Sequence, residues 1–333
     1  MDSKRRDAIK FIATAPTGMF FLREDRAAKV EPEEALPWIA AGIVAASHLS
    51  YTPDLITADQ VAASYLPTLI QITDDKDYRR EAARLTTQAY TIRAVLAWHI
   101  NPKNAISHGL QAEKYSILTK NPMLQAHTLR IVAMAYFYGR NYQAAMQKML
   151  KTQEIINNNP VPNAMKSWVY VELAKYQGYH GLIDESRETM KLVYKYRSVQ
   201  KIHGIGGYES EHTLRRQEGE ALAARALHHS NKQEAKALHS AALECYEQSG
   251  QTTNIYGERH RIELLNNTLI SMLSQQSPDK EECIQVWTDA LSSAQSLQSE
   301  QRFMEAVIIL AMMQGIWSEE DDIRGLQAIA THW

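Results

Sequence analysis

The chain has 333 residues, of which 45% are hydrophobic and 22% are charged, a mixture typical of a folded protein. Its 14 glycines and 10 prolines are few for this length. That shortage excludes collagen-like and turn-rich all-β architectures and favours helices, because each internal Gly or Pro destabilises a helix. With 36 basic and 38 acidic residues, the net charge of −2 gives no long-range field that would attract nucleic acid or an anionic membrane.

Residues 1–31 are predicted to form a basic N-terminal arm or linker. The paired Arg5 and Arg6 are similar to a twin-arginine export signal, but the apolar stretch that follows, 11–22, is short and contains Pro16. Charged residues then stand where a small-residue cleavage site would lie. We therefore expect a cytoplasmic protein, with export through this N-terminus as the minor alternative.

From residue 32 onward, the spacing of apolar residues and of Pro or Gly breakers predicts antiparallel helix pairs. No shift in composition divides this stretch, so one domain is expected over 32–333. The predicted pairs are 33–50 with 57–73, 78–99 with 102–119, 123–139 with 142–157, 162–180 with 183–200, 211–230 with 232–248 and 255–275 with 279–298, followed by helices at 300–316 and 320–330.

Small residues recur at fixed places in these pairs. Ala133 is followed twelve residues later by Ala145, and Ala174 is followed twelve residues later by Ser186. Small side chains let two paired helices approach closely, while larger ones fill the space between pairs. The corresponding positions in the second helices are Ala63, Ala105, Ala145, Ser186, Ala235 and Cys283, at separations of 42, 40, 41, 49 and 48 residues.

This pattern resembles tetratricopeptide repeats, whose standard period is about 34 residues. The longer period here indicates longer helices with inserted loops. The resemblance implies an all-α fold, a right-handed α-solenoid of about six to seven antiparallel helix pairs. The chain is also similar to the sensor halves of bacterial regulators that join a helix-turn-helix domain to such repeats. Residues 1–31 are too few for that DNA-binding domain, so the resemblance implies either a free-standing sensor or scaffold or a DNA-binding regulator in trans.

In tetratricopeptide proteins the first helices of the pairs line a concave face that holds a peptide or a partner helix. The resemblance therefore implies a non-catalytic protein that binds a protein or peptide and acts as a regulatory sensor or scaffold, without a cofactor. The residues expected on this face are His127, Arg130, Met134, Tyr138, Lys175, Tyr179, Glu220 and His228.

An all-α enzyme remains the alternative function, although no nucleophile, base and acid occur at a recognisable spacing. Cys245 and Cys283 are 38 residues apart, which matches no metal or redox motif, and each is expected to be a buried apolar side chain. His203 and His212 lie in the glycine-containing loop 201–212, at a spacing that does not favour a metal site. No metal is expected.

Direct nucleic-acid binding is not expected either. Its best candidate is the face formed by Lys191, Tyr194 and Lys195, whose cations also suit the C-terminal end of a helix. No membrane partner is expected, because the longest apolar stretch beyond the N-terminal arm, 35–49, has 15 residues and a transmembrane helix needs about 20.

Overall fold

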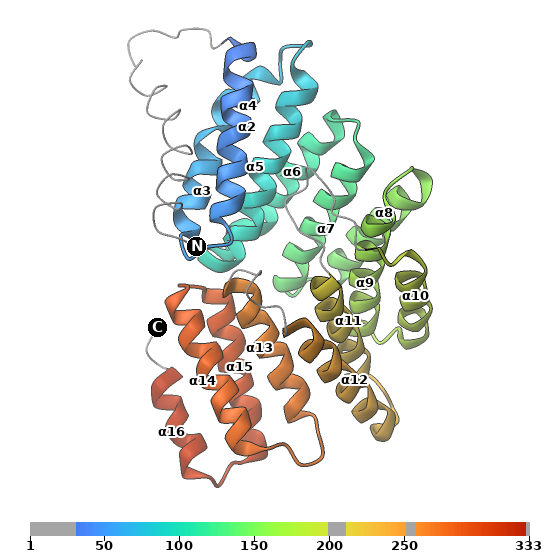
Figure 1. The fold of residues 1–333 in the computed structure, drawn as a ribbon, viewed down its shortest axis with the longest axis vertical. Coiled ribbons are helices and arrows are strands. Elements are labelled where there is room, and N and C mark those ends of the chain that lie inside the picture. Colours follow the sequence, from blue (N-terminus) through green and yellow to red (C-terminus); the bar gives the residue numbers. More distant parts are fainter. Residues whose placement is uncertain (1–30, 199–210, 251–257, 331–333) are drawn as a thin grey trace. The chain divides into compact units, whose positions relative to one another are not determined.

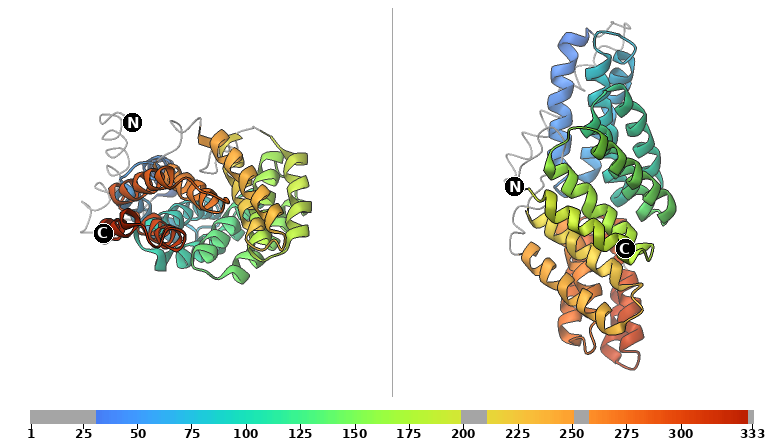
Figure 2. Two further views of the ribbon diagram at one scale, coloured as in Figure 1. Left: turned by 90° about the horizontal axis from the view of Figure 1, so that it is seen from below. Right: turned by 90° about the vertical axis from the view of Figure 1, so that its right-hand side faces the viewer.

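The computed structural model describes residues 31–198, 211–250 and 258–330, with the side chains of 211 and 212 excepted. Every regular element in these ranges is a helix, as the sequence predicts. The chain divides after Pro160 into two compact units, and each is described here by itself. The expectation of a single repeat domain over 32–333 therefore stays a prediction. Figures 1 and 2 show neighbouring helices of each unit running antiparallel, side by side.

The first unit is built from seven helices and one short 3-10 turn among its described residues. In it α2 packs on α3 and α5, while α5 pairs with α6 and α7 pairs with α8. The elements are α2 (Pro32–Leu49), α3 (Leu55–Ser64), α4 (Leu66–Ile72), α5 (Arg79–Ile100), η1 (Pro102–Asn104), α6 (Ala105–Leu118), α7 (Pro122–Tyr138) and α8 (Tyr142–Asn158).

The described residues of the second unit form three further pairs and a final short pair. In it α9 contacts α10 and α11, α11 contacts α12, and α13 contacts α14 and α15. The helices are α9 (Asn163–Tyr179), α10 (Ile183–Tyr196), α11 (Glu211–Ala226), α12 (Lys232–Gly250), α13 (Glu258–Leu273), α14 (Lys280–Ser296), α15 (Glu300–Ile316) and α16 (Asp321–Ala330).

The predicted helix 57–73 is the clearest difference between sequence and structure. It is two helices, α3 and α4, which meet at Tyr65. Pro67 explains the break, because it has no backbone N–H to donate to the carbonyl of Ala63 and its ring crowds that turn. The phenol ring of Tyr65 is buried instead against Gly42 of α2, where a side chain on the glycine would collide with it.

Turn and cap residues set most other boundaries where the sequence places them. The side chain of Asn121 accepts hydrogen bonds from the backbone N–H groups of Met123 and Leu124, at 3.0 and 3.2 Å, and so begins α7. Gly181, with φ of +73°, ends the turn after α9 in the left-handed conformation that glycine adopts without strain.

The small residues predicted in the second helices are mostly at helix contacts. Ala105, Ala145, Ser186 and Cys283 are buried, whereas Ala63 and Ala235 are only partly buried. In the second unit the Ser186 hydroxyl donates a hydrogen bond of 2.7 Å to the carbonyl of Ala174. The twelve-residue spacing thus joins α10 to α9 directly.

Gly178 marks the closest approach of α9 to α11. A Cβ at this position would lie 2.9 Å from the backbone nitrogen of Arg225 and 3.0 Å from the Cβ of Ala224. Since backbone atoms cannot swing aside as a long side chain can, a larger residue here would have to push the two helices apart.

Replacing Gly178 with Ala should therefore destabilise the protein by about 1–3 kcal/mol through overpacking. Gly315 is the matched control, because it is also the penultimate residue of its helix and has no neighbour within 4 Å of an added Cβ. Gly315→Ala should be neutral or stabilising by up to about 1 kcal/mol. Urea unfolding would measure both, and equal effects would contradict the close contact.

Candidate functional site

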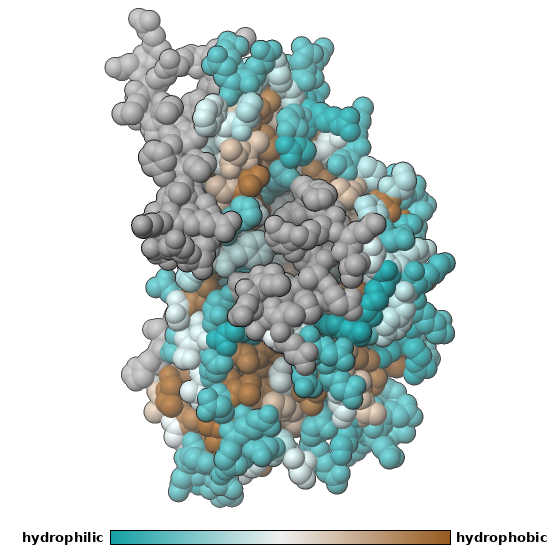
Figure 3. Space-filling model, in the orientation of Figure 1, coloured by the Kyte–Doolittle hydropathy of each residue, from teal (hydrophilic) through white to brown (hydrophobic). Residues whose placement is uncertain are grey.

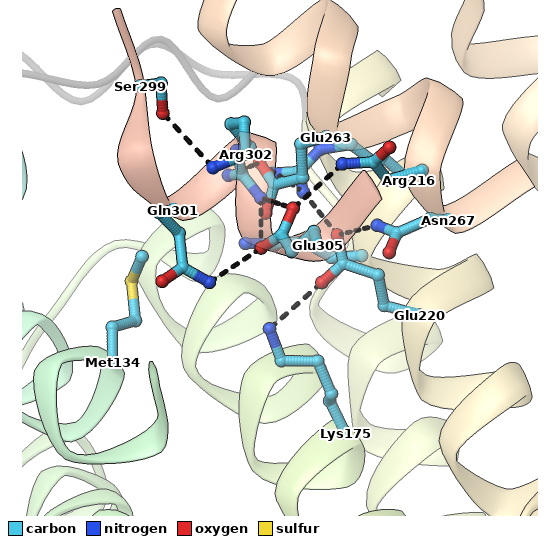
Figure 4. A network of polar contacts seen from close by, with 12 residues as sticks. Met134, Lys175, Arg216, Glu220, Glu263, Asn267, Ser299, Gln301, Arg302 and Glu305 are labelled. Atoms are coloured by element: carbon cyan, nitrogen blue, oxygen red, sulfur yellow. Dashed lines mark hydrogen bonds and ion pairs between the residues drawn. The ribbon is translucent and has the colours of Figure 1, made fainter. Parts of the chain in front are cut away.

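In the second unit, a row of charged side chains in contact with one another connects the first helices of the helix pairs, α9, α11, α13 and α15 (Figure 4). Lys175 of α9 lies at one end of it, and Glu220 of α11 comes next. Its carboxylate accepts a hydrogen bond of 2.9 Å from the Lys175 ammonium of α9 and one of 3.1 Å from the Asn267 amide of α13. Arg216, one turn earlier in α11, pairs with the same carboxylate.

This row of ion pairs continues through Glu263 of α13. Arg216 donates to it at 3.0 Å, and Arg302 of α15 donates to the same oxygen at 3.1 Å. Arg302 also pairs with Glu305 of its own helix at 2.8 Å, and Glu305 accepts a hydrogen bond of 3.0 Å from the Asn266 amide of α13. Four helices are thereby joined through charge-assisted hydrogen bonds. We call Lys175, Arg216, Glu220, Glu263, Arg302 and Glu305 the ion-pair network.

Helical spacing gives these side chains their common face. Arg216 and Glu220 are four residues apart, and Arg302 and Glu305 are three apart, so each couple lies on one side of its helix. Ser299 begins α15 by accepting a hydrogen bond of 3.3 Å from the Arg302 backbone N–H. This cap fixes where Arg302 enters the network.

The network is formally neutral, and all of its side chains except the partly exposed Glu305 are buried. Lys175 and Glu220 are each 7% exposed, and Arg302 is 5% exposed. Three cations face three carboxylates, so no net charge is buried. Burying ions costs several kcal/mol each, and this cost is offset only when every charge keeps its partners.

Glu263 shows the electrostatic effect most clearly. Burial alone would raise the pKa of its carboxyl, but the guanidinium groups of Arg216 and Arg302 outweigh burial and hold that pKa well below its usual range. The carboxylate therefore stays ionised at neutral pH. It is a weak base and a strong ion-pair partner.

A second polar contact joins α9 to α11 one turn away. The Gln217 amide donates a hydrogen bond of 3.1 Å to the carboxylate of Glu172, and both side chains are buried. Together with Lys175 and Glu220, these residues make a polar seam between the two helices.

The structure brings together four of the eight predicted face residues, in two pairs. Lys175 and Glu220 form the buried ion pair described above. Tyr179 and His228 form the other, because the imidazole Nε2 of His228 lies 3.0 Å from the backbone carbonyl of Tyr179. Both members of this second pair are exposed, so the pair stands at the accessible end of the α9–α11 seam.

The other four predicted residues lie on α7 in the first unit. His127 and Arg130 are buried, and burial followed by the charge of Arg130 holds the pKa of His127 well below its usual value. A guanidinium nitrogen of Arg130 lies 3.6 Å from the sulfur of Met134. Tyr138 packs its ring against Trp98 of α5, with the ring centres 5.1 Å apart.

The predicted face is therefore less open than the sequence led us to expect. Arg130 and Lys175 are covered, and Tyr138 is only partly exposed, whereas Tyr179 is 36% exposed. The side chains of Arg130 and Lys175 make their contacts inside the protein, with Met134 and Glu220. The binding roles of all eight residues stay predictions.

Sequence reasoning missed Arg216, Glu263, Arg302 and Glu305. The phase of the first helices was taken from small residues, and α13 contains neither Ala nor Gly from which to set it. The available signal was the recurrence of an Arg followed by Glu after three or four residues in α11 and α15, within a row of first helices.

The residues considered for other functions take part in internal contacts. On α10, the Lys191 ammonium pairs with Glu188 at 2.6 Å and the Tyr194 hydroxyl donates to the buried Glu218. Burial, followed by Glu218, raises the pKa of Tyr194 to about 12. This face is thus partly committed to contacts inside the second unit.

Both cysteines are buried with free thiols, as predicted, and burial raises the pKa of each to about 11. Among the described residues, no three His, Cys, Asp or Glu side chains are placed to hold a metal ion. The export-like arm with Arg5 and Arg6, and the loop containing His203, lie outside the described residues. The hypotheses about export through this arm and about a metal site in this loop therefore stay predictions.

Across the helices that the structure describes, none combines the length and the apolar character needed to cross a membrane. The cytoplasmic location predicted from the sequence stays a prediction.

Comparison with known proteins gives little beyond this geometry. No protein-family model matches the chain, and no curated protein sequence matches it. Among solved structures, the chain is similar to a signal transduction ATPase with numerous domains that has a tetratricopeptide repeat sensor, from Pyrococcus horikoshii. The identity is 14% and the TM-score is 0.40, over 99% of this chain and 52% of the other. The chain thus spans about half the length of that protein.

Coupling within the ion-pair network can be measured with Lys175→Met, Glu220→Gln and the double variant. Lys175→Met should cost about 3 kcal/mol, because it breaks a buried pair, while Glu220 keeps Arg216 and Asn267. In a double-mutant cycle by urea unfolding, the two positions should be coupled by about 1 kcal/mol or more. Strictly additive losses would contradict a direct interaction.

The pH dependence of stability should contain a contribution from Glu263. Because its pKa is lowered in the folded state, its ion pairs contribute fully above the unfolded pKa of about 4.3, and the contribution is lost as the pH falls further. Glu263→Gln should lower stability at pH 7 and flatten the fall between about pH 4.3 and pH 2. Parallel pH curves for wild type and variant would contradict this assignment.

Proposed function

We propose that this chain is a non-catalytic helical repeat protein that binds a protein or peptide partner along the first helices of its pairs, as a regulatory sensor or scaffold. The observation that carries the proposal is the ion-pair network, which places charged side chains on four successive first helices, α9, α11, α13 and α15.

Stability alone does not account for such a network. Replacing a buried ion pair with apolar residues of similar volume is often neutral or stabilising. Buried charges are better suited to specificity, because a ligand that carries its own carboxylates and cations can exchange partners with them. Each internal ion pair thus determines the sign of the charge that a ligand group must carry to replace one member of the pair.

The accessible part of this face gives a ligand a place to begin. Tyr179 and His228 lie exposed at the end of the seam between α9 and α11, one turn from Lys175. Tyrosine and histidine offer hydrogen bonds together with apolar ring surface, which suits them to a peptide backbone. Binding would start there and continue toward Lys175 and Glu220.

The enzyme alternative has no specific support from these contacts. Acid–base catalysis needs a carboxyl group that can take up a proton near neutral pH. Glu220 and Glu305 accept hydrogen bonds from cations and amides, and Glu263 pairs with two guanidinium groups that shift its pKa away from neutrality. These carboxylates behave as ion-pair partners.

The proposal is tested by affinity capture from a lysate of the source cells, with the intact chain as bait. The test variant is Lys175→Met/Glu220→Gln, which removes one charge of each sign without leaving like charges together. The matched control is Lys191→Met/Glu188→Gln, which makes the same changes in an exposed pair on α10. Quantitative mass spectrometry would compare the proteins and peptides retained.

We expect a partner that is retained by wild type and by the α10 control and lost from the network variant. Circular dichroism and thermal unfolding must show that all three baits are folded. A peptide from the captured partner, titrated by calorimetry, should repeat the order. Equal retention by the network variant would refute binding along this face, and recovery of a small metabolite alone would favour the enzyme alternative.

A further inference from the structure

The outer side of α15 carries a row of large apolar side chains that are partly exposed to solvent. Met304, Ile308, Met312 and Ile316 recur every four residues along it, and they are 48%, 46%, 36% and 43% exposed. We call these four residues the α15 stripe. Figure 3 shows hydrophobic residues at the surface over the part of the chain that holds α13 to α16.

The first half of the stripe, Met304 and Ile308, lies opposite the buried Ala306 of α15. The backbone carbonyl of Ala306 accepts a hydrogen bond of 2.8 Å from the Trp287 indole of α14, and Ala306 is fully buried. Met304 and Ile308 are two residues from Ala306, which is about 200° around an α-helix. Although α15 contacts α13, α14 and α16, each side chain of the stripe keeps 36% to 48% of its surface exposed.

The hydrogen bonds of the preceding first helix, α13, indicate which side of α15 a further helix would contact. In α13, Asn267 hydrogen-bonds back to α11 and its neighbour Asn266 hydrogen-bonds forward to α15. In α15, Glu305 accepts the hydrogen bond from α13. By analogy with Asn266 and Asn267 of α13, the preceding residue, Met304, lies at the position from which α15 would contact a following helix. The stripe thus continues the helix-to-helix interface of the second unit beyond its last full helix.

Charges at the two ends of α15 select the kind of helix that fits. Glu300 at the beginning and Glu319 just after the end are exposed acids, and the sole basic residue of α15, Arg302, is buried in the ion-pair network. A second copy of α15 would place acid beside acid in either orientation, antiparallel or parallel. Complementarity therefore favours a different helix with Lys or Arg beside its apolar face.

We infer that the α15 stripe is a docking surface for an amphipathic helix of a partner protein, one with large apolar residues at three- and four-residue spacing and basic residues at its flanks. The two methionines suit this role, because their flexible side chains adapt to different apolar surfaces. Docking would extend the stack of first helices by one member. This site is separate from the face of the proposed function.

The test uses a synthetic peptide of about 18 residues, long enough to span the stripe, with Leu on one helical face and Lys on its flanks. One control peptide has the same composition rearranged so that its Leu residues share no face, and another has Glu in place of Lys. Fluorescence anisotropy would follow each peptide with wild type and with Ile308→Glu. The protein control is Ile117→Glu, which changes an isoleucine of α6 that is 59% exposed.

We expect saturable binding of the first peptide, weakened at least about tenfold by Ile308→Glu and unchanged by Ile117→Glu. Met304→Glu should repeat the loss, and circular dichroism should show all three variants folded. Equal binding of the rearranged peptide, or no effect of Ile308→Glu, would overturn the inference. Sedimentation that shows wild-type dimers and Ile308→Glu monomers would assign the stripe to a second copy instead.

Because this experiment leaves Lys175 and Glu220 unchanged, its outcome is independent of the test of the ion-pair network. Loss of peptide binding in Ile308→Glu with normal capture of the network's partner would establish two surfaces. Unchanged peptide binding in Ile308→Glu, with normal capture of the network's partner, would remove the stripe and leave the proposed function standing.

Discussion

The contact between Arg216 and Glu263 is the constraint on which the second unit depends. Together with the hydrogen bond from Asn267 to Glu220, it joins α11, and through α11 also α9, to α13 and α15. A charge in this environment cannot shift to a new partner without first losing the one it has. The register of the four helices is therefore fixed more tightly than apolar packing alone would fix it.

Small residues and caps make that register possible. Gly178 brings the backbones of α9 and α11 close enough for Lys175 to reach Glu220, and the Ser299 cap places Arg302 at the start of α15. These residues carry no charge, but each determines where a charged neighbour can stand. The ion pairs and the close helix contacts are thus parts of one arrangement.

The sequence predicted the helices well because their boundaries are set locally. Asn121 and Gly181 act through their own backbone neighbourhood, so the turns they make can be recognised without the rest of the fold. The break at Tyr65 was the exception, since it required the effect of Pro67 to be weighed against a strong apolar pattern.

The candidate site was predictable only in part, because ion pairs between helices depend on contacts distant in sequence. Lys175 and Glu220 were found because small residues set the phase of α9 and α11. Glu263 lies on α13, which has neither Ala nor Gly to set the phase, and Arg302 lies on α15, whose small residues were not used to set one. Burial was not predicted for Arg130 or Lys175, because the sequence pattern gives a position on a helix face and not the cover above it.

The polar contacts between neighbouring first helices also show how this architecture tolerates irregular repeats. The partners are 45 residues apart for Lys175 and Glu220, 47 for Glu220 and Asn267, and 39 for Asn266 and Glu305. Each contact constrains only two adjacent helices, so the connections between pairs can lengthen or shorten while the charges still meet. Insertions in the connecting loops are therefore tolerated, whereas a substitution that changes the charge of one partner requires a compensating substitution on the neighbouring helix.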